Sequence, residues 1–462
     1  MSINWNNAAE RTIEADLGMI PEVGTLLSVL VSIFWPKSGE DVWSQIKDQV
    51  EQLIQKDISQ EVYQDVQNNL NGLQNDLQYY VTAAKHKENP SVIGDYWITA
   101  DSNFGHDQPN FQSKDYQLLL LPLFAQFANL NLSLLRDGVL FGKSWGCDQN
   151  RMDDVVNELN QKILEFTKYV KDVYEAEYFQ LSGLTAPNLH TGEPFRTVNA
   201  FVRQMTLGVL DFANLWPYFA KASQPDNPIE INLNREIYSD PVGTADDSGL
   251  IMLPSPPTLP ISQFTVWGGG LIDAVQLAYP EGGGPNGVTV TARMGDQPSK
   301  NGGGSNQPPH GGVFDVSNNP VSVVTAYAGD VLNALQFDFI KGGRTRVLGT
   351  NNDKTLMYIY SYPREVLSSI HINGVSTFYG TADCAVFGFK YEQSQKADLD
   401  ALRHFYIASP SSETINDLAA RCVTKQVAMD QLSAKASAES WDAQRAQYWE
   451  YLEARKSMTH SA

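Results

Sequence analysis

The chain has 462 residues and a mass of 51.3 kDa, enough for about two to four domains with buried cores. Hydrophobic residues make up 42% of it and charged residues 19%, which is typical of folded soluble proteins and unlike disordered or fibrous chains. Acidic residues outnumber basic ones by 53 to 33, so the formal net charge is −20. This excess of negative charge excludes nucleic acid as the main partner, because the phosphate backbone would be repelled.

The sequence lacks the motifs of the common enzyme and cofactor chemistries. The three cysteines, Cys147, Cys384 and Cys422, are far apart and odd in number, which predicts neither a disulfide framework nor a metal site. Residues 282–287 (GGGPNG) match the spacing of a dinucleotide-binding loop, but a strand pattern follows them where that mechanism needs a helix. We therefore expect no cofactor, no metal and no enzymatic activity.

The first half of the chain has the pattern of a helical domain, which we place at residues 1–241. Apolar residues recur every three to four positions over 42–58, 62–81, 152–173 and 198–215. This is the spacing of amphipathic helices that turn one face to a common core. The pattern predicts an N-terminal helical bundle.

Residues 116–141 (YQLLLLPLFAQFANLNLSLLRDGVLF) are apolar on nearly every side of the helix that they predict. Such a helix must be enclosed by other helices or by lipid. Its length of about 39 Å exceeds the roughly 30 Å of a bilayer's hydrocarbon layer. The polar residues within it favour a face shared with other helices or with water. The side chains expected to insert into a membrane are Leu118, Leu119, Leu120, Leu121, Phe124, Phe127, Leu130, Leu132, Leu134 and Leu135.

The second half of the chain changes to a strand pattern. Residues 242–262 are rich in Pro, Gly and Ser and predict a linker. In residues 263–394, apolar residues alternate with polar or short ones over 288–294, 335–339 and 387–391, with Gly- and Pro-rich loops between them. This period of two predicts antiparallel strands.

An internal repeat lies in the strand region. Residues 272–277 (IDAVQL) match residues 332–337 (LNALQF), 60 positions later, and residues 383–389 (DCAVFGF) form a looser third copy. Three copies predict three similar sheets around an axis, which is a β-prism. Residues 395–462 return to a helical pattern and predict a C-terminal helical tail. The predicted fold class is therefore multidomain α and β, with a helical bundle, a three-sheet antiparallel β-prism and a tail.

Two blocks in the helical half resemble the three-domain insecticidal crystal toxins (delta-endotoxins, Cry-type) of spore-forming bacteria. Residues 127–137 (FANLNLSLLRD) resemble the central fifth helix of that family. Residues 205–211 (MTLGVLD) and 234–241 (NREIYSDP) resemble its seventh helix and the crossover into the next domain. The resemblance covers about residues 15–241.

The resemblance implies a function. In that family a seven-helix-type bundle encloses the fifth helix, and the protein kills insect midgut cells by binding surface receptors and opening pores. The partners implied are the target-cell membrane and a surface receptor or glycan, with a homo-oligomer in the pore. The N-terminus lacks a basic and then apolar segment, so no signal peptide is expected. We expect storage in the producer's cytoplasm or an inclusion, release on lysis, and action at the target-cell plasma membrane.

The sequence also departs from the family in three respects. Residues 263–394 resemble the family's second domain but are nearer in length to a compact jacalin-type lectin. No β-sandwich third domain fits into residues 395–462, and no long extension rich in Cys and Lys is present. Residues 99–114, which correspond to the fourth helix of the inserting hairpin, contain Gly105 and Pro109 and predict a short or broken helix.

Four charged residues in the two matching blocks are candidates for buried ion pairs. They are Arg136, Asp137, Asp211 and Arg235. We expect them to fix helix packing and the domain interface. The alternative is a latch that is released when the bundle opens.

A candidate sugar site lies in the strand region at Gly380 and Asp383, in a turn before a strand. Jacalin-type lectins bind sugar hydroxyls with a Gly and an Asp in such a loop, although the spacing here is one residue shorter, and a plain turn is the alternative. The sequence as a whole favours an insecticidal pore-forming toxin. The alternative is a carbohydrate-binding, lectin-type defence protein whose helical domain is structural.

Overall fold

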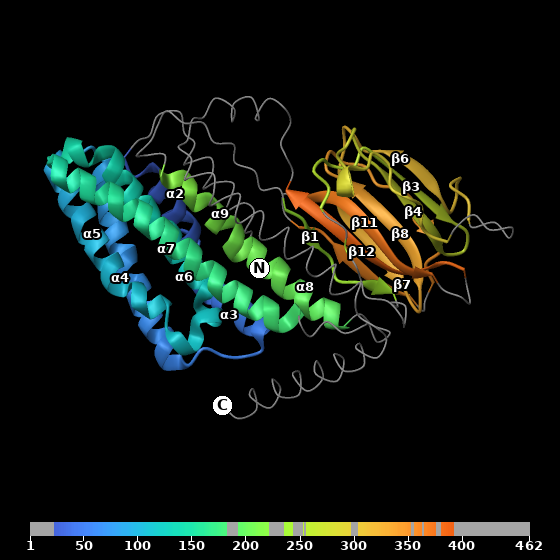
Figure 1. Ribbon diagram of the computed structural model, residues 1–462, viewed down its shortest axis with the longest axis horizontal. Coiled ribbons are helices and arrows are strands. Elements are labelled where there is room, and N and C mark those ends of the chain that lie inside the picture. Colours follow the sequence, from blue (N-terminus) through green and yellow to red (C-terminus); the bar gives the residue numbers. More distant parts are fainter. Residues whose placement is uncertain are drawn as a thin grey trace.

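The computed structural model describes residues 23–182, 193–220, 235–243, 253, 256–296, 304–352, 355–362, 365–375 and 380–391. These residues form a helical bundle and a separate β-domain beside it (Figure 1). The predicted tail, residues 395–462, lies outside the described residues.

The bundle is built around one central helix. α6 packs against α2, α3, α5, α7 and α9, and is the predicted apolar helix (Figure 1). The π-helical turn η3 joins α8 to α9 without a break. The helices are α2 (Thr25–Phe34), α3 (Val42–Ile54), α4 (Gln60–Lys85), α5 (Pro90–Phe111), α6 (Gln117–Phe141), α7 (Gln149–Ser182), α8 (Glu193–Met205) and α9 (Asp211–Phe219), with the short turns η1 (Lys114–Tyr116), η2 (Gly142–Trp145) and η3 (Thr206–Leu210).

The prediction of a short or broken helix over residues 99–114 is wrong, because α5 continues to Phe111. Asn89 caps its first turn by accepting a hydrogen bond from the Ser91 amide at 3.2 Å. Pro109 removes only one hydrogen bond, in the last turn, where the helix ends two residues later. A continuous buried face outweighs the poor helix propensity of the other side; its residues are Ile93, Gly94, Trp97, Ala100, Phe104 and Phe111.

The β-domain consists of three four-stranded antiparallel sheets around one core, which confirms the predicted prism. One sheet contains β1 (Ile237–Tyr238), β2 (Val242–Gly243), β11 (Glu365–Val375) and β12 (Ala382–Tyr391). The second has the order β10 (Leu356–Tyr360), β7 (Val321–Ala328), β8 (Leu332–Phe339) and β9 (Leu348–Gly349). The third has the order β5 (Met294–Gly295), β4 (Ile272–Ala278), β3 (Gln263–Gly268) and β6 (Gly312–Asp315). Of the strand predicted over residues 288–294, only its last residue lies in a strand, β5.

The three copies of the sequence repeat occupy equivalent strands, β4, β8 and β12. In each copy the third residue of the strand pairs with a glycine of a two-residue strand; the pairs are Ala274 with Gly295, Ala334 with Gly349, and Cys384 with Gly243. All three glycines have a positive φ, and a Cβ on any of them would lie 2.1–2.4 Å from a carbonyl oxygen of the repeat strand. The same close approach of two backbones requires glycine in all three copies. The shared register therefore shows that the weaker third copy belongs to the repeat.

The prism begins earlier in the chain than the sequence predicts. β1 and β2 lie within residues assigned to the bundle and the linker, yet both pair with β12 at the far end of the domain. The linker therefore follows these strands instead of preceding the prism. Two-residue strands carry no periodicity, so their pattern could not show this.

A buried polar cluster ties β1 to the core of its sheet. The Glu236 carboxylate accepts hydrogen bonds from Tyr238 and Ser369 at 2.6 Å each and from Ser368. Since the Ser369 hydroxyl donates to Glu236, it accepts from Nε2 of His371, 2.8 Å away. Burial lowers the pKa of His371 to about 4. This histidine is therefore neutral in the folded protein at ordinary pH.

The low pKa of His371 predicts a loss of stability in acid. The unfolded chain binds a proton near pH 6.5 and the folded protein only near pH 4, so stability falls as the pH drops through this window. The loss attributable to this group approaches about 3 kcal/mol at pH 4. We expect His371→Gln to remove that slope in urea unfolding measured from pH 7 to pH 4. Parallel slopes for the two proteins would contradict the assignment.

Candidate functional site

The central helix α6 is almost completely enclosed. Among the described residues, the one helical stretch long and apolar enough to cross a bilayer is Lys114–Trp145, and 94% of its most apolar window is buried. Of the ten side chains expected to insert, Leu118 is half-buried and the other nine are at most 2% exposed. The bundle thus holds nearly all of the apolar surface of α6 away from water.

α5 is fitted onto α6 by a close contact between Trp97 and Gly138. The Trp97 indole donates a hydrogen bond to the Leu134 carbonyl at 2.7 Å. Its six-membered ring lies over Gly138, where a Cβ would be only 2.3 Å from Cζ2 of the ring. Further along, Phe127 of α6 stacks on Phe111 of α5 with ring centroids 4.4 Å apart. The two helices therefore form an interlocked antiparallel hairpin.

Two polar side chains of α6, those of Gln126 and Asn129, hold it against η3 and α9. Gln126 donates to the Gly208 carbonyl at 2.8 Å. Asn129 donates to Gln126 at 2.7 Å and accepts from the Trp216 indole at 2.6 Å. All of these groups are buried, so each hydrogen bond offsets the cost of removing a polar group from water. They give the helix a fixed rotation in the bundle.

Asn131 differs from the other polar residues of α6. Its side chain is fully buried, and neither its oxygen nor its nitrogen has a hydrogen-bond partner among the described residues. A buried amide without partners costs about 1–3 kcal/mol per group. The folded bundle therefore contains an unfavourable polar group at the middle of its most apolar helix.

Asp137, near the end of α6, joins three helices. Its Oδ2 accepts from the Tyr80 hydroxyl of α4 and from the Gly24 amide just before α2, each at 2.9 Å. The guanidinium of Arg136 approaches Oδ1 of Asp137 at 3.7 Å. The sequence points to the charged pair but not to Gly24 or Tyr80, which are 113 and 57 positions away.

Arg235 joins the bundle to the prism. It forms a bidentate ion pair with Asp211 at the start of α9, with Nη2 to Oδ2 at 2.7 Å, and a second with Glu365 of β11 at 2.5 Å. Burial alone lowers the pKa of Arg235, but the two carboxylates raise it above its ordinary range. Both carboxylates are at most 1% exposed, so this charge cluster lies in the domain interface. The sequence indicates two of the three partners and misses Glu365.

A row of residues on α8 extends the same interface. Asn199 donates to the carbonyls of Tyr238 and Ser239 at 3.1 and 2.9 Å. Arg203 donates to the Tyr238 carbonyl at 2.6 Å and to Asp240 at 3.2 Å. Hydrogen bonds and charges therefore help to hold the prism to the bundle, and polar interfaces are typical of domains that move relative to one another.

The predicted sugar site falls at the start of β12. Gly380 has φ +63° and lies in the turn, and Asp383 is half-buried on the strand. In the second repeat the equivalent residue, Asn333, accepts a hydrogen bond from the Gly329 amide at 2.8 Å and closes the turn. Sugar binding here stays a prediction. Within the described ranges, no group of three or more His, Cys, Asp or Glu side chains is placed to hold a metal ion.

Comparison with known proteins identifies the bundle. Residues 12–220 match the family model of the delta endotoxin N-terminal domain. The bundle is therefore a delta-endotoxin N-terminal domain. The chain is 30% identical over 237 residues to pesticidal crystal protein Cry8Ba of Bacillus thuringiensis serovar kumamotoensis, covering 49% of this chain and 20% of the relative. It is 33% identical over 238 residues to Cry19Ba of Bacillus thuringiensis subsp. higo, covering 48% and 34%.

The chain spans about a fifth to a third of the length of these curated delta-endotoxin relatives. Solved structures extend the likeness of fold to the prism. The Cry7Ca1 protein of Bacillus thuringiensis matches with a TM-score of 0.69 and 19% identity, over 84% of this chain and 74% of that one. PirB matches with a TM-score of 0.66 and 15% identity, over 87% and 97%. At these identities the structures show a shared delta-endotoxin fold.

Proposed function

We propose that this protein is an insecticidal pore-forming delta-endotoxin that binds a gut-cell surface receptor or glycan and inserts helices of its bundle into the membrane. The observation that carries the proposal is α6, a helix long enough to span a bilayer, apolar on nearly every side and hidden by amphipathic neighbours. Transfer of this surface from the bundle to lipid keeps it out of water. The mechanism is a change of conformation without covalent chemistry.

The hairpin of α5 and α6 is the proposed inserting unit. α5 has 22 residues and α6 has 25, so their lengths are about 33 and 38 Å, and each exceeds the roughly 30 Å of the hydrocarbon layer. The interlocked Trp97 and Gly138 support movement of the two helices together. The polar outer side of α5 would face water in the pore, because lipid disfavours charged side chains.

The remaining steps of the proposed mechanism are those that the resemblance to the delta-endotoxin family implies. The prism binds the receptor or glycan, with Gly380 and Asp383 as candidate contacts, and several copies assemble in the pore. The toxin is stored in the producer's cytoplasm or an inclusion and is released on lysis. Arg136, Asp137, Asp211 and Arg235 fix the helix packing and the domain interface of the stored form, which binding or proteolysis opens.

Replacing Asn131 by leucine tests whether the buried amide biases the bundle towards opening. Leucine has a similar shape and no polar atoms, so we expect Asn131→Leu to raise the free energy of unfolding by about 1–3 kcal/mol and to slow pore formation. Asn129→Leu is the matched control. It leaves Gln126 and Trp216 without their partner and should destabilise by about 2–4 kcal/mol. Equal effects of the two substitutions in urea unfolding would contradict the assignment.

The proposed function is tested by calcein release from vesicles that carry insect gut brush-border membrane. The full chain is added with and without trypsin across pH 6–10. We expect release, and its dependence on trypsin and pH identifies the trigger. Membrane binding with no release under any condition would reject the pore and favour the lectin-type defence protein.

A further inference from the structure

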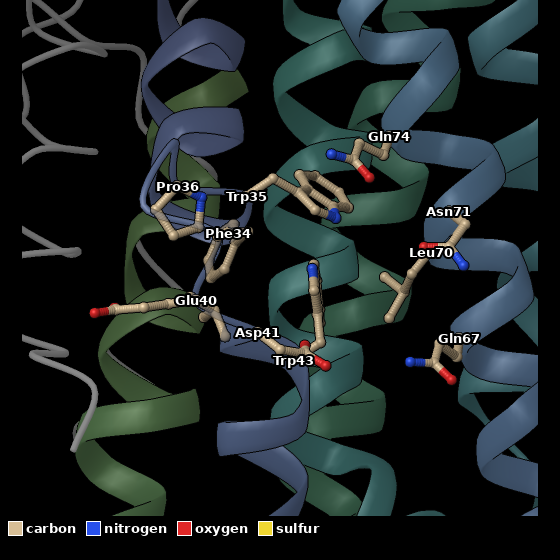
Figure 2. A pocket seen from close by; sticks show the side chains of 12 residues that line it. Phe34, Trp35, Pro36, Glu40, Asp41, Trp43, Gln67, Leu70, Asn71 and Gln74 are labelled. Carbon is tan, nitrogen blue, oxygen red and sulfur yellow. The ribbon is translucent and has the colours of Figure 1, made fainter. Parts of the chain in front are cut away.

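A pocket of about 260 Å³ opens between the loop that joins α2 to α3 and one face of α4 (Figure 2). Three residues determine the shape of the loop. Pro36 follows the end of α2, Gly39 takes a positive φ of +76°, and the Asp41 side chain caps α3. The other wall is a stripe of α4 at helical spacing, with Gln67, Leu70, Asn71 and Gln74.

Aromatic rings form the floor and one side of the pocket. Trp43 lies 5.2 Å from Phe34 and 5.4 Å from Trp35, measured between ring centroids. Figure 2 shows the Trp43 ring between the loop and α4, with its nitrogen on the side towards Trp35. Trp35 is only half-buried, so one aromatic ring stays accessible. Such a surface suits the apolar face of a ring-shaped ligand.

The indole nitrogen of Trp43 indicates what the ligand must supply. Trp43 is 4% exposed, and its N–H has no hydrogen-bond partner among the described residues. A buried indole N–H is a donor only, so it needs an acceptor from outside the described chain. The three amides of α4 offer both donors and acceptors beside it. Groups that both donate and accept, such as hydroxyls, match this set.

The charges of the pocket exclude other ligand classes. Among the described residues, its lining contains no Lys, Arg or His, so an anionic ligand would meet no counter-charge there. Of its two carboxylates, Asp41 is already used by the Ser44 amide and hydroxyl, at 3.0 and 2.6 Å. A quaternary ammonium would suit the aromatic rings but offers no acceptor to the Trp43 N–H. A neutral polyhydroxylated ring satisfies all of these conditions.

We propose that this pocket binds one sugar ring of a neutral glycan. The Trp43 N–H donates to a sugar oxygen, the amides of Gln67, Asn71 and Gln74 bond to its hydroxyls, and an aromatic ring packs on its apolar face. The bundle then carries a glycan site of its own, apart from the prism. This proposal does not depend on pore formation, because binding by the soluble chain is a separate property.

An array of neutral and sialylated oligosaccharides, probed with the full chain, tests the proposal. The neutral oligosaccharide that binds best is then titrated free in solution, and displayed on vesicles as a glycolipid to establish whether the membrane-bound form is also recognised. Trp43→Phe keeps a ring and removes the N–H, and we expect the Kd to rise about five- to tenfold. Gln74→Leu should have a similar effect. Gln64→Leu on the same helix lies outside the pocket and should leave the Kd unchanged.

Several outcomes would overturn the proposal. The first is that no neutral glycan binds, and the second is that choline chloride displaces the bound glycan. The third is that neither Trp43→Phe nor Gln74→Leu alters the Kd, which would place the site on the prism. Gln74→Leu decides the question if Trp43→Phe fails to fold, because Gln74 is half-exposed. Calcein release from glycan-free vesicles tests the pore separately, so failure of one proposal leaves the other standing.

Discussion

Gly138→Ala is expected to destabilise the bundle by about 3 kcal/mol, although alanine is the better helix former. The new Cβ would lie 2.3 Å from Cζ2 and 2.7 Å from Cε2 of Trp97, a residue that is only 1% exposed. Relief requires the ring to shift, which strains the core and weakens its hydrogen bond to the Leu134 carbonyl. Overpacking costs about 1–3 kcal/mol, and a buried N–H without a partner costs a similar amount.

Urea unfolding of two further variants makes the Gly138 prediction specific. Gly105 lies in α5 with nothing within 4 Å of its Cβ position, so Gly105→Ala should stabilise the protein by about 0.5–1 kcal/mol. Opposite signs for the two glycine substitutions are therefore expected. Trp97→Phe shortens the ring over Gly138, so the double variant should lose less stability than the two single variants together. Additive losses would show that Trp97 and Gly138 do not contact as described.

The sequence predicts the elements whose signal is local and periodic. The stripes of α3, α4, α7 and α8 follow the helical period, and the all-round apolarity of residues 116–141 identifies α6 as the enclosed helix. The repeat at 272–277 and 332–337, with its looser third copy at 383–389, predicts the prism because three copies indicate three similar sheets. In each case the pattern of apolar residues in the sequence marks the positions that the fold buries.

The features that the sequence did not predict share one physical cause, because contacts between residues far apart in the chain determine them. α5 has poor local propensity at Gly105 and Pro109, yet its buried face overrides both. β1 and β2 are too short to show alternation, and they pair with a strand more than 140 positions away. Glu365 and Tyr80 take part in the buried charge clusters, but the residues near them in the sequence do not indicate which side chains they contact.

Arg235→Met is expected to have the largest effect of any single substitution in the domain interface. It leaves the buried carboxylates of Asp211 and Glu365 without the guanidinium that both of them bind, and removal of one partner from a buried ion cluster costs about 3–5 kcal/mol. Urea unfolding followed by tryptophan fluorescence measures this loss. Arg344→Met is the matched control, because Arg344 pairs with Asp338 on the surface of the prism and is 62% exposed. Its loss should be within about 0.5 kcal/mol.

The triple variant Asp211→Asn, Arg235→Met, Glu365→Gln separates charge from shape. With all three charges removed, no buried carboxylate lacks a partner, so stability should return to within about 1–2 kcal/mol of the wild type. If the cluster acts as a latch, Arg235→Met should also release calcein from vesicles at a lower trypsin concentration than the wild type, and the triple variant should do the same. A stable Arg235→Met protein would refute the buried cluster. An unstable variant with unaltered calcein release would restrict the cluster to a structural role, because the charges that join the two domains would then not control when the domains separate.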